Sequence, residues 1–304
     1  MMAAAAPPIP GKRRAWLLAV RPPTLPAAVA PVLAGTGIAA VDGDFEVGRF
    51  FLALIGAVFI QIVVNFANDL SDFRRGADTP DRLGPPRAVA QGWLSQREMT
   101  VGITLATAAA LIVGIVLILI VGWPILIIGG ASLIAAVTYT GGPLPYGYRG
   151  LGDPICFLFF GFVAVMGAGY VQIEELTWEL AAASVPVGCL VTAILVVNNL
   201  RDIDTDRSSD KRTLAVLIGE RNTRIEYVVL TVGAFVSIAV FASVGLLPYY
   251  CFIAWLGLPP AMWLSREIVN GRAGVALNPM LKRTAQLHLL VGALIGLGGV
   301  LATV

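Results

Sequence analysis

Two short segments of the sequence carry carboxylates and carboxamides at the spacing of a helix face. The first reads VVNFANDLSD and ends at Asp72, and the second reads VVNNLRDIDTD and ends at Asp206. Residues four apart lie on the same face of a helix, so each segment, if helical, presents a ladder of oxygen ligands. The pairs at this spacing are Asn65 with Asp69, Asn68 with Asp72, and Asp202 with Asp206.

Such oxygen-only ladders suggest a divalent metal. Hard oxygen ligands favour Mg²⁺, which Mn²⁺ could replace, and Mg²⁺ usually keeps several waters and is completed by substrate phosphates. Crowded carboxylates also repel one another unless a cation lies between them. Basic residues near the ladders could offset phosphate charge, and these are Arg87, Arg149, Lys211 and Arg212. Because the sequence has no GxxxxGKS or GxxxxGKT loop, we expect a diphosphate that arrives on a lipid.

The two segments also resemble each other, which suggests an internal repeat. Aligning Asn65 with Asn198 superposes Asp69 on Asp202. Four apolar segments separate the two, so both acidic ends are expected on the same side of a membrane. Paired repeats in membrane proteins often place a polar site at their shared interface. The alternative is that each cluster is solvated beyond the bilayer or paired with neighbouring arginines.

Composition defines the elements that must position these ladders. Of 304 residues, 57% are hydrophobic and 13% charged, with a mean hydropathy of +0.82, whereas soluble domains have about 25% charged residues. A membrane span needs about 20 mostly apolar residues, and the segments lack the alternation of a membrane barrel. We predict an all-α membrane bundle of about nine helices that encloses a cavity open to the cytoplasm and to lipid. The predicted segments are 24–41, 50–68, 99–121, 123–140, 154–172, 180–200, 225–244, 247–265 and 284–303.

The distribution of basic residues predicts the orientation. With the N-terminus inside, every Lys and Arg except Arg49 lies on the cytoplasmic side, as the positive-inside rule requires. We expect a bacterial inner-membrane protein that does not bind nucleic acid. No cleavable signal peptide is evident. Residues 1–20 are predicted to be a disordered cytoplasmic tail, and 21–304 a single transmembrane domain of two four-helix repeats plus a final helix.

The motifs resemble those of the UbiA-type intramembrane prenyltransferases, and most closely the branch that acts on dihydroxynaphthoate. The segments that carry the resemblance are NFANDLSDFRRGAD, RLGPPRAVAQGWLS, YTGGPLPYGYRGLGD and NNLRDIDTDRSSDKRTLAVLIGER. The spacing of the motifs agrees from roughly residue 20 to 300. Where many relatives have the last Asp of the first motif, this chain has Gly76, and Asp78 instead matches the RGxD of the naphthoate branch. In the second motif, Asp210 replaces a common Gly before the Lys.

The resemblance implies a reaction. Mg²⁺ binds a polyprenyl diphosphate, the allylic C–O bond breaks, and the carbocation attacks the ring of 1,4-dihydroxy-2-naphthoate with loss of CO₂. The product is demethylmenaquinone in its reduced quinol form. Metal and bases would stabilise the charge that develops on the leaving diphosphate. The carbocation must be kept from water, so loops 70–98 and 201–224 are candidate lids, with ordinary solvated linkers as the alternative.

The resemblance also implies roles for individual residues. Tyr139 could face the cation or the phosphate, or be a tyrosine of the interfacial belt. Asp153 could orient the acceptor, assist proton removal, or cap the following helix. The expected catalytic residues are Asp69, Asp72, Asp202, Asp206 and Tyr139. The expected residues for diphosphate and acceptor are Asn65, Arg87, Lys211, Arg212, Asn198, Arg201 and Asp153. The expected metal ligands are Asn68, Asp72, Asp78, Asp202 and Asp206.

Two other functions remain open from the sequence. A UbiA relative could use another acceptor, such as 4-hydroxybenzoate, homogentisate or haem. A transporter could bind a cation and a phospholipid between the repeats, although the acidic pairs lie at helix ends and not in interrupted mid-bilayer segments. A phosphoalcohol transferase is not expected, because its DGxxAR signature is absent.

Overall fold

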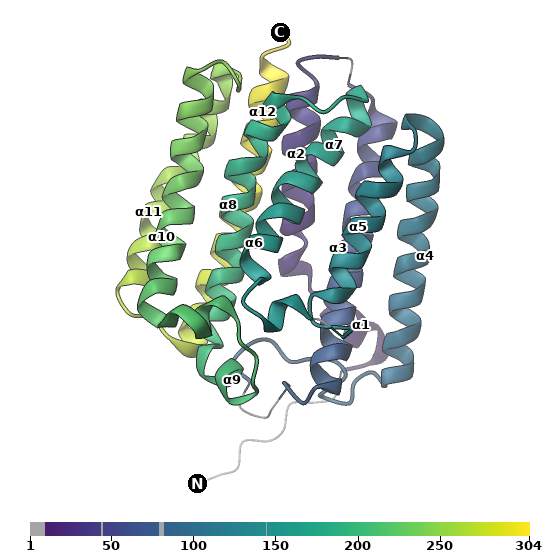
Figure 1. Cartoon of the computed structure of the whole chain (residues 1–304), viewed down its shortest axis with the longest axis vertical. Helices are drawn as coiled ribbons and strands as arrows, with labels where there is room; N and C mark the ends of the chain where they lie inside the picture. Colours follow the sequence, from purple (N-terminus) through teal and green to yellow (C-terminus); the bar gives the residue numbers. More distant parts are fainter. Residues whose placement is uncertain (1–9, 44, 79–81, 144) are drawn as a thin grey trace.

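The chain folds into a bundle of helices that run roughly along its longest axis (Figure 1). The computed structural model describes residues 10–43, 45–78, 82–143 and 145–304. Within these ranges no strand forms, and the β-type pairing consists of one isolated bridge between Arg149 and Arg212. The predicted all-α class is therefore confirmed.

Six helical segments of the described chain are long and apolar enough to cross a membrane. The bent pair α1–η1 and α2, with 48° between its halves, would raise the number to seven. The predicted nine membrane helices remain a prediction, because α5 (Pro124–Thr138) is short and η4–α11 (Tyr249–Val269) begins as a 3-10 helix. The six segments are α3 (Val47–Arg74), α4 (Gln96–Val121), α6–η3–α7 (Gly152–Ile173), α8 (Trp178–Arg201), α10 (Leu214–Ser243) and η5–α12 (Gly274–Leu301).

The start of the described chain corrects one expectation. Residues 12–20, predicted to belong to a disordered tail, form the helix α1 (Lys12–Val20). Ala15 and Ala19 are buried in a cluster that includes Phe66 of α3, and Lys12 pairs with Glu98 at 2.6 Å. The apolar stripe that packs on α3 explains why this basic segment is helical. Residues 1–9 lie outside the described residues.

Helices α2 (Pro26–Ala39) and α12 (Asn278–Leu301) approach each other closely because glycines line their contact. A Cβ atom on Gly296 would lie 2.2 Å from the carbonyl oxygen of Leu33, and one on Gly37 would lie 2.2 Å from that of Gly296. Small residues of this kind allow backbones to pack directly in membrane bundles. The contact joins a helix from the first part of the chain to its last helix.

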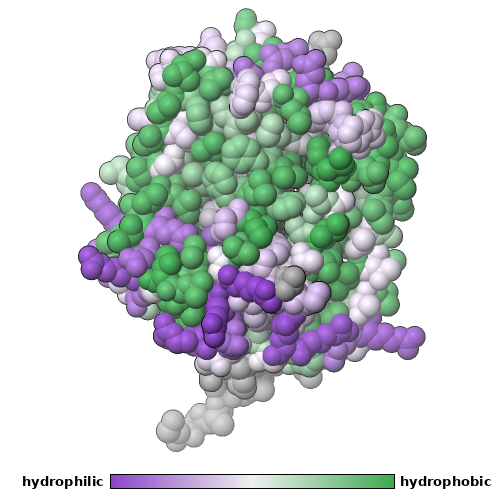
Figure 2. All heavy atoms as spheres, in the orientation of Figure 1, coloured by the Kyte–Doolittle hydropathy of each residue, from purple (hydrophilic) through white to green (hydrophobic). Residues whose placement is uncertain are grey.

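The surface has the distribution expected of a membrane protein. Figure 2 shows apolar side chains over the middle of the molecule and hydrophilic ones gathered towards its two ends. Exposed large hydrophobic residues are frequent on α4 and α10. By contrast, α8 is largely buried at the centre of the bundle.

The segments that carry the two ladders end on the same side of the bundle. Helix α3 ends at Arg74, and α8 ends at Arg201 with Asp202 as a non-helical cap (φ −98°, ψ 10°) before the short helix α9 (Ile203–Ser208). The described parts of the following loop, 75–78 and 82–95, and the turn after α9 lie at this same end, near α1 (Figure 1). The fold thus brings the two acidic segments together.

Candidate active site

A cavity of about 430 Å³ extends from the loop end of the bundle into its apolar interior. Side chains of α2, α3, α4, α5, α6–α7 and α8 form its walls. The acidic ends of α3 and α8 both face this cavity, as their similarity suggested. The predicted site residues that line it are Asn65, Asn68, Asp72, Arg87, Tyr139, Asn198, Asp202, Asp206 and Lys211.

Asp72 is the carboxylate of the first ladder that faces the cavity. It is 3% exposed, and its two oxygens accept hydrogen bonds from Arg87 Nη2 at 2.6 Å and from the hydroxyl of Tyr148 at 2.9 Å. One turn earlier, the side-chain oxygen of Asn68 accepts a hydrogen bond from the hydroxyl of Thr140 at 2.9 Å. The ladder is therefore held by groups from two different loops.

Asp69 has a different environment from that expected. Its carboxylate does not line the cavity and accepts backbone N–H bonds from Ala88 at 2.9 Å and Val89 at 3.1 Å. Because α3 continues unbroken past this point, whereas α8 ends just before Asp202, aligned positions do not present the same face. The structure places Asp69 as the anchor of the loop that carries Arg87.

In the second ladder, one arginine orients the carboxylate. Arg201 is 3% exposed and does not line the cavity. Its guanidinium donates to both oxygens of Asp202 at 2.7 and 2.5 Å, to the side-chain oxygen of Asn198 at 2.9 Å and to that of Asn278 at 2.9 Å. Asn278 in turn donates to the carbonyl oxygen of Leu83 at 3.0 Å. These bonds join α8, the start of α12 and the loop after α3.

Tyr148 and Lys211 connect the two ladders. The ammonium of Lys211 lies 3.4 Å from Asp206 and 5.5 Å from the centre of the Tyr148 ring, whose hydroxyl bonds Asp72. Burial raises the pKa of Asp206 to about 6, against the opposing effect of Lys211. Burial lowers the pKa of Lys211, but Asp206, Asp72 and Asp202 together raise it above its usual value. Lys211 therefore supplies a fixed positive charge between the ladders.

Three other predicted residues lie outside the cavity wall. Asp78 accepts a hydrogen bond from Arg82 at 2.7 Å and lies 3.5 Å from Arg87, and burial raises its pKa to about 6. Arg212 is exposed and pairs with Asp210. Asp153 is buried next to the cavity residue Gly152, and its carboxylate oxygens have no hydrogen-bond partner among the described residues.

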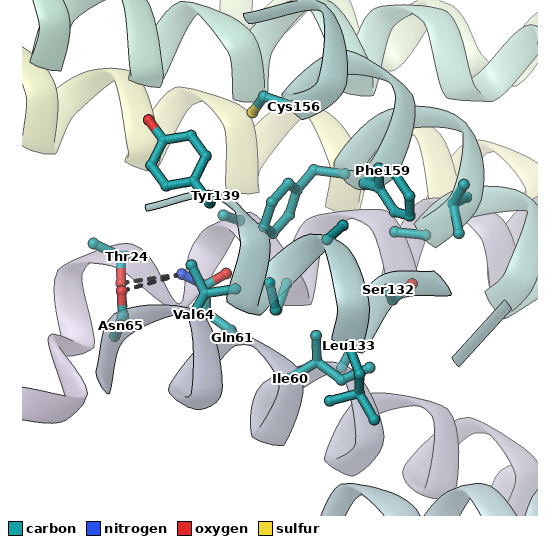
Figure 3. A pocket seen from close by; sticks show the side chains of 18 of the residues that line it. Thr24, Ile60, Gln61, Val64, Asn65, Ser132, Leu133, Tyr139, Cys156 and Phe159 are labelled. Atoms are coloured by element: carbon teal, nitrogen blue, oxygen red, sulfur yellow. Dashed lines mark hydrogen bonds between the residues drawn. The ribbon is translucent and has the colours of Figure 1, made fainter. Parts of the chain in front are cut away.

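The structure also adds cavity residues that the sequence reasoning missed. Arg21, between α1 and η1 (Pro22–Thr24), lines the cavity, and its Nη2 is buried without a partner among the described residues. Arg82 lines it from the loop after α3. Thr24 and Gln61 also line it, and both contact Asn65 (Figure 3). Isolated residues such as Arg21 and Gln61 form no motif, so only their environment reveals them.

The interior end of the cavity is an apolar groove. It is lined by α4 and α5, and three of its lining residues, Leu111, Ile115 and Leu126, are more than half exposed on the surface of the bundle. The groove is therefore open on the side that would face lipid. Gly129 and Gly130 also line it, and a Cβ atom on either would meet no other atom within 4 Å. The groove is therefore unfilled beside these two glycines.

The donor set is compatible with Mg²⁺. Carboxylate and amide oxygens of Asn68, Asp72, Asp202 and Asp206 line one cavity. Within the described ranges, no three His, Cys, Asp or Glu side chains gather closely enough to enclose a metal. Mg²⁺ is usually held by one or two carboxylates, with substrate phosphates completing its shell. A set divided between two helices suits an ion that binds together with a diphosphate.

Comparisons with known proteins agree with this geometry. Residues 28–279 match the UbiA prenyltransferase family. The chain is 39% identical to the 1,4-dihydroxy-2-naphthoate octaprenyltransferase of Escherichia coli, over 94% of this chain and 95% of that protein. It is also 39% identical to the enzyme of the same name from Mycobacterium tuberculosis, over 92% and 94% of the two chains.

Solved structures show the same fold. The apo structure of a UbiA homologue from Aeropyrum pernix superposes with a TM-score of 0.70 at 16% identity, covering 88% of this chain and 96% of that one. A UbiA homologue from Archaeoglobus fulgidus bound to GPP and Mg²⁺ superposes with a TM-score of 0.64 at 15% identity, covering 95% and 99%. At these identities the superpositions support the fold alone.

Proposed function

This chain belongs to the UbiA prenyltransferase family, and from that premise we propose that it transfers a polyprenyl group from polyprenyl diphosphate to 1,4-dihydroxy-2-naphthoate in the synthesis of menaquinone. The observation that carries the proposal is a single cavity that joins two acidic ladders and several bases to an apolar groove open at the bundle surface. A diphosphate with a long hydrocarbon tail matches both halves of this cavity. The chain is a prenyltransferase with an aromatic acceptor.

The polar end binds the diphosphate. Arg21, Arg82, Arg87 and Lys211 line it, and such bases offset phosphate charge through directed hydrogen bonds. Arg87 and Lys211 each pair with a ladder carboxylate, Asp72 and Asp206, so they can exchange part of that contact for phosphate oxygens. Arg21 has an unused donor among the described residues. Asp69 and Asp78 act through the loop, because they hold Ala88, Val89 and Arg82 in place.

Asn68, Asp72, Asp202 and Asp206 would hold Mg²⁺, or Mn²⁺ in its place. When bound, the ion supplies positive charge that stabilises the leaving diphosphate. The chain's own contribution is to hold these oxygens in position: Arg201 orients Asp202, and Tyr148 orients Asp72. The metal-bound Archaeoglobus relative supports this part of the proposal by analogy of fold.

The groove between α4 and α5 holds the prenyl tail, and the acceptor ring reaches the allylic carbon from beside Tyr139. The allylic C–O bond breaks, and the allylic carbon forms a bond to the ring carbon that carries the carboxylate. That carboxylate leaves as CO₂, and its bonding electrons restore the aromatic ring, so no net proton is released. The aromatic face of Tyr139, which packs edge-on against Tyr146, can stabilise the allylic cation.

The cation must also be shielded from water. The loop after α3 contributes Arg82 and Arg87 to the cavity, and Asp69 fixes the backbone of this loop at Ala88 and Val89. These contacts support a lid role for the described parts of the loop, 75–78 and 82–95, and residues 79–81 lie outside the described residues. The basic residues at this end support a position at the cytoplasmic face of the inner membrane.

The proposal is tested with the purified protein in lipid nanodiscs. We expect labelled octaprenyl diphosphate, dihydroxynaphthoate and Mg²⁺ to yield prenylated product and CO₂ in equal amounts. Replacing the acceptor by 4-hydroxybenzoate, homogentisate or haem should give no product. Product from one of these acceptors alone would reassign the substrate within the family. Failure to release diphosphate with any acceptor would refute prenyl transfer.

A further inference from the structure

A small polar cluster lies in the apolar part of the cavity wall. It consists of Thr24, Gln61 and Asn65, from η1 and α3, and all three line the cavity. Figure 3 shows the cluster on one side of the cavity, with Tyr139, Cys156 and Phe159 on the other. The surrounding lining, such as Ile60 and Val64, is apolar. Polar groups in such surroundings are costly unless they have a partner.

Two backbone carbonyls fix the direction of every hydrogen bond in this cluster. The Nδ2 group of Asn65 donates to the carbonyl oxygen of Val20 at 2.8 Å and to the Thr24 hydroxyl at 2.9 Å. The hydroxyl hydrogen of Thr24 is used on the carbonyl oxygen of Arg21 at 2.9 Å. A carbonyl can only accept, so the side-chain oxygen of Asn65 must face Gln61 as an acceptor, and Thr24 must accept as well.

Gln61 is therefore fixed in one amide orientation. Its Nε2 group lies 3.5 Å from both the side-chain oxygen of Asn65 and the hydroxyl oxygen of Thr24. Rotating the amide would place its oxygen against two acceptors. The Oε1 atom of Gln61 is left buried without a hydrogen-bond partner among the described residues, although the residue is only 5% exposed. The cluster thus offers the cavity one unused acceptor.

The missing partner must be a hydrogen-bond donor, which narrows the choice of ligand. The prenyl tail has no donor, and a diphosphate presents acceptors. A dihydroxyaryl acid has two hydroxyl donors, of which the one beside the carboxylate bonds internally. Gln61 precedes Asp72 on α3 by about 16 Å, at 1.5 Å per residue, which leaves space for a diphosphate group and one aromatic ring between them.

We propose that the Oε1 atom of Gln61 accepts a hydrogen bond from the 4-hydroxyl of 1,4-dihydroxy-2-naphthoate. This is the ring hydroxyl that is not adjacent to the carboxylate. Gln61 is then the residue that selects an acceptor with two hydroxyls para to each other. Thr24 and Asn65 fix the direction of its amide. This inference rests on the proposed function and adds the subsite that recognises the acceptor.

The test compares two acceptor analogues that each lack one hydroxyl, 1-hydroxy-2-naphthoate and 4-hydroxy-2-naphthoate. Their dissociation constants are measured by calorimetry on the purified protein in nanodiscs, so turnover is not needed. The wild type should bind the 4-hydroxy analogue more tightly. Gln61→Met keeps the length of the side chain but removes the acceptor, and it should reduce this preference about tenfold, the ratio that one neutral hydrogen bond sustains.

The matched control is Gln172→Met. Gln172 is also a buried carboxamide, 6% exposed, but it accepts a hydrogen bond from the backbone of Glu46 at 2.9 Å and does not line the cavity. This variant should keep the wild-type preference. An unchanged preference in Gln61→Met, or an equal loss in both variants, would overturn the inference while leaving prenyl transfer intact. A wild type that prenylates no acceptor would refute the proposed function and the subsite together.

Discussion

Arg201 should control how well the site binds its metal, even though it does not touch the cavity. Its guanidinium makes four hydrogen bonds, two of them to Asp202 and one each to Asn198 and Asn278. The substitution Arg201→Lys keeps the charge and places it on a single nitrogen. Lys lacks the planar fork that allows Arg to bind a carboxylate with two parallel bonds. The carboxylate of Asp202 would then lose its fixed orientation.

The size of the effect follows from the bonds that are lost. One ammonium cannot reach Asp202, Asn198 and Asn278 together, so at least two of the four bonds are lost. Each hydrogen bond to a charged group contributes about 1.5 kcal/mol or more, which gives a total of about 3 kcal/mol. If the lost free energy is stabilisation of the transition state, kcat/KM decreases by about 100-fold. The Mg²⁺ concentration for half-maximal activity also rises.

In the assay the Mg²⁺ concentration is varied, and two quantities are measured. These are the rate of prenyl transfer and the thermal midpoint of the protein in the presence of inorganic diphosphate. The matched control is Arg224→Lys. Arg224 is also buried and bonds Glu220 and the backbone of Ile268 and Arg272, away from the cavity. The control should lower stability without shifting the Mg²⁺ titration. If Arg201→Lys kept kcat/KM within threefold of the wild type and an unchanged titration, the positioning role of Arg201 would be refuted.

Three further substitutions test other parts of the site. Asp72→Asn should lower kcat at least about 100-fold with unchanged helical circular dichroism, because it removes a charged ligand opposite developing charge; near-normal turnover would exclude Asp72 from the metal site. Asp69→Ala leaves the backbone amides of Ala88 and Val89 without their partner and should cost about 3 kcal/mol of stability. The loss should appear as a lower thermal midpoint and faster tryptic cleavage of the loop. Unchanged cleavage would argue against Asp69 as the anchor of the loop. Gly129→Leu adds a side chain in the groove at a point where a Cβ atom meets no other atom. The value of kcat/KM should fall about tenfold for octaprenyl diphosphate and little for geranyl diphosphate. Equal losses for both substrates would contradict the assignment of the groove to the prenyl tail.

The sequence was sufficient for the parts of the site that form a pattern. Asp72, Asp202 and Asp206 recur at helical spacing at the ends of apolar segments, so their convergence could be predicted and is observed in the cavity lining. The all-α class followed from segment length and hydropathy. The repeat predicted that two helix ends would meet, although it could not predict the face that each would present.

Asp69 illustrates why the remaining details could not be predicted. Its equivalence to Asp202 depended on two unbroken helices, but α8 ends at Arg201. Arg21 and Gln61 were missed for another reason, because a single arginine or glutamine carries no signal until the fold gives it a buried donor or acceptor without a partner. The helicity of residues 12–20 was missed because nine residues rich in bases have little intrinsic tendency to fold without a packing surface.

The opening between α4 and α5 determines how this protein meets its hydrophobic substrate. Since Leu111, Ile115 and Leu126 are both cavity lining and bundle surface, the tail can enter sideways from the bilayer without passing through water. The quantity that sets saturation is then the mole fraction of polyprenyl diphosphate among the surrounding lipids. Adding inert phospholipid at a constant bulk concentration of substrate should slow the reaction by surface dilution.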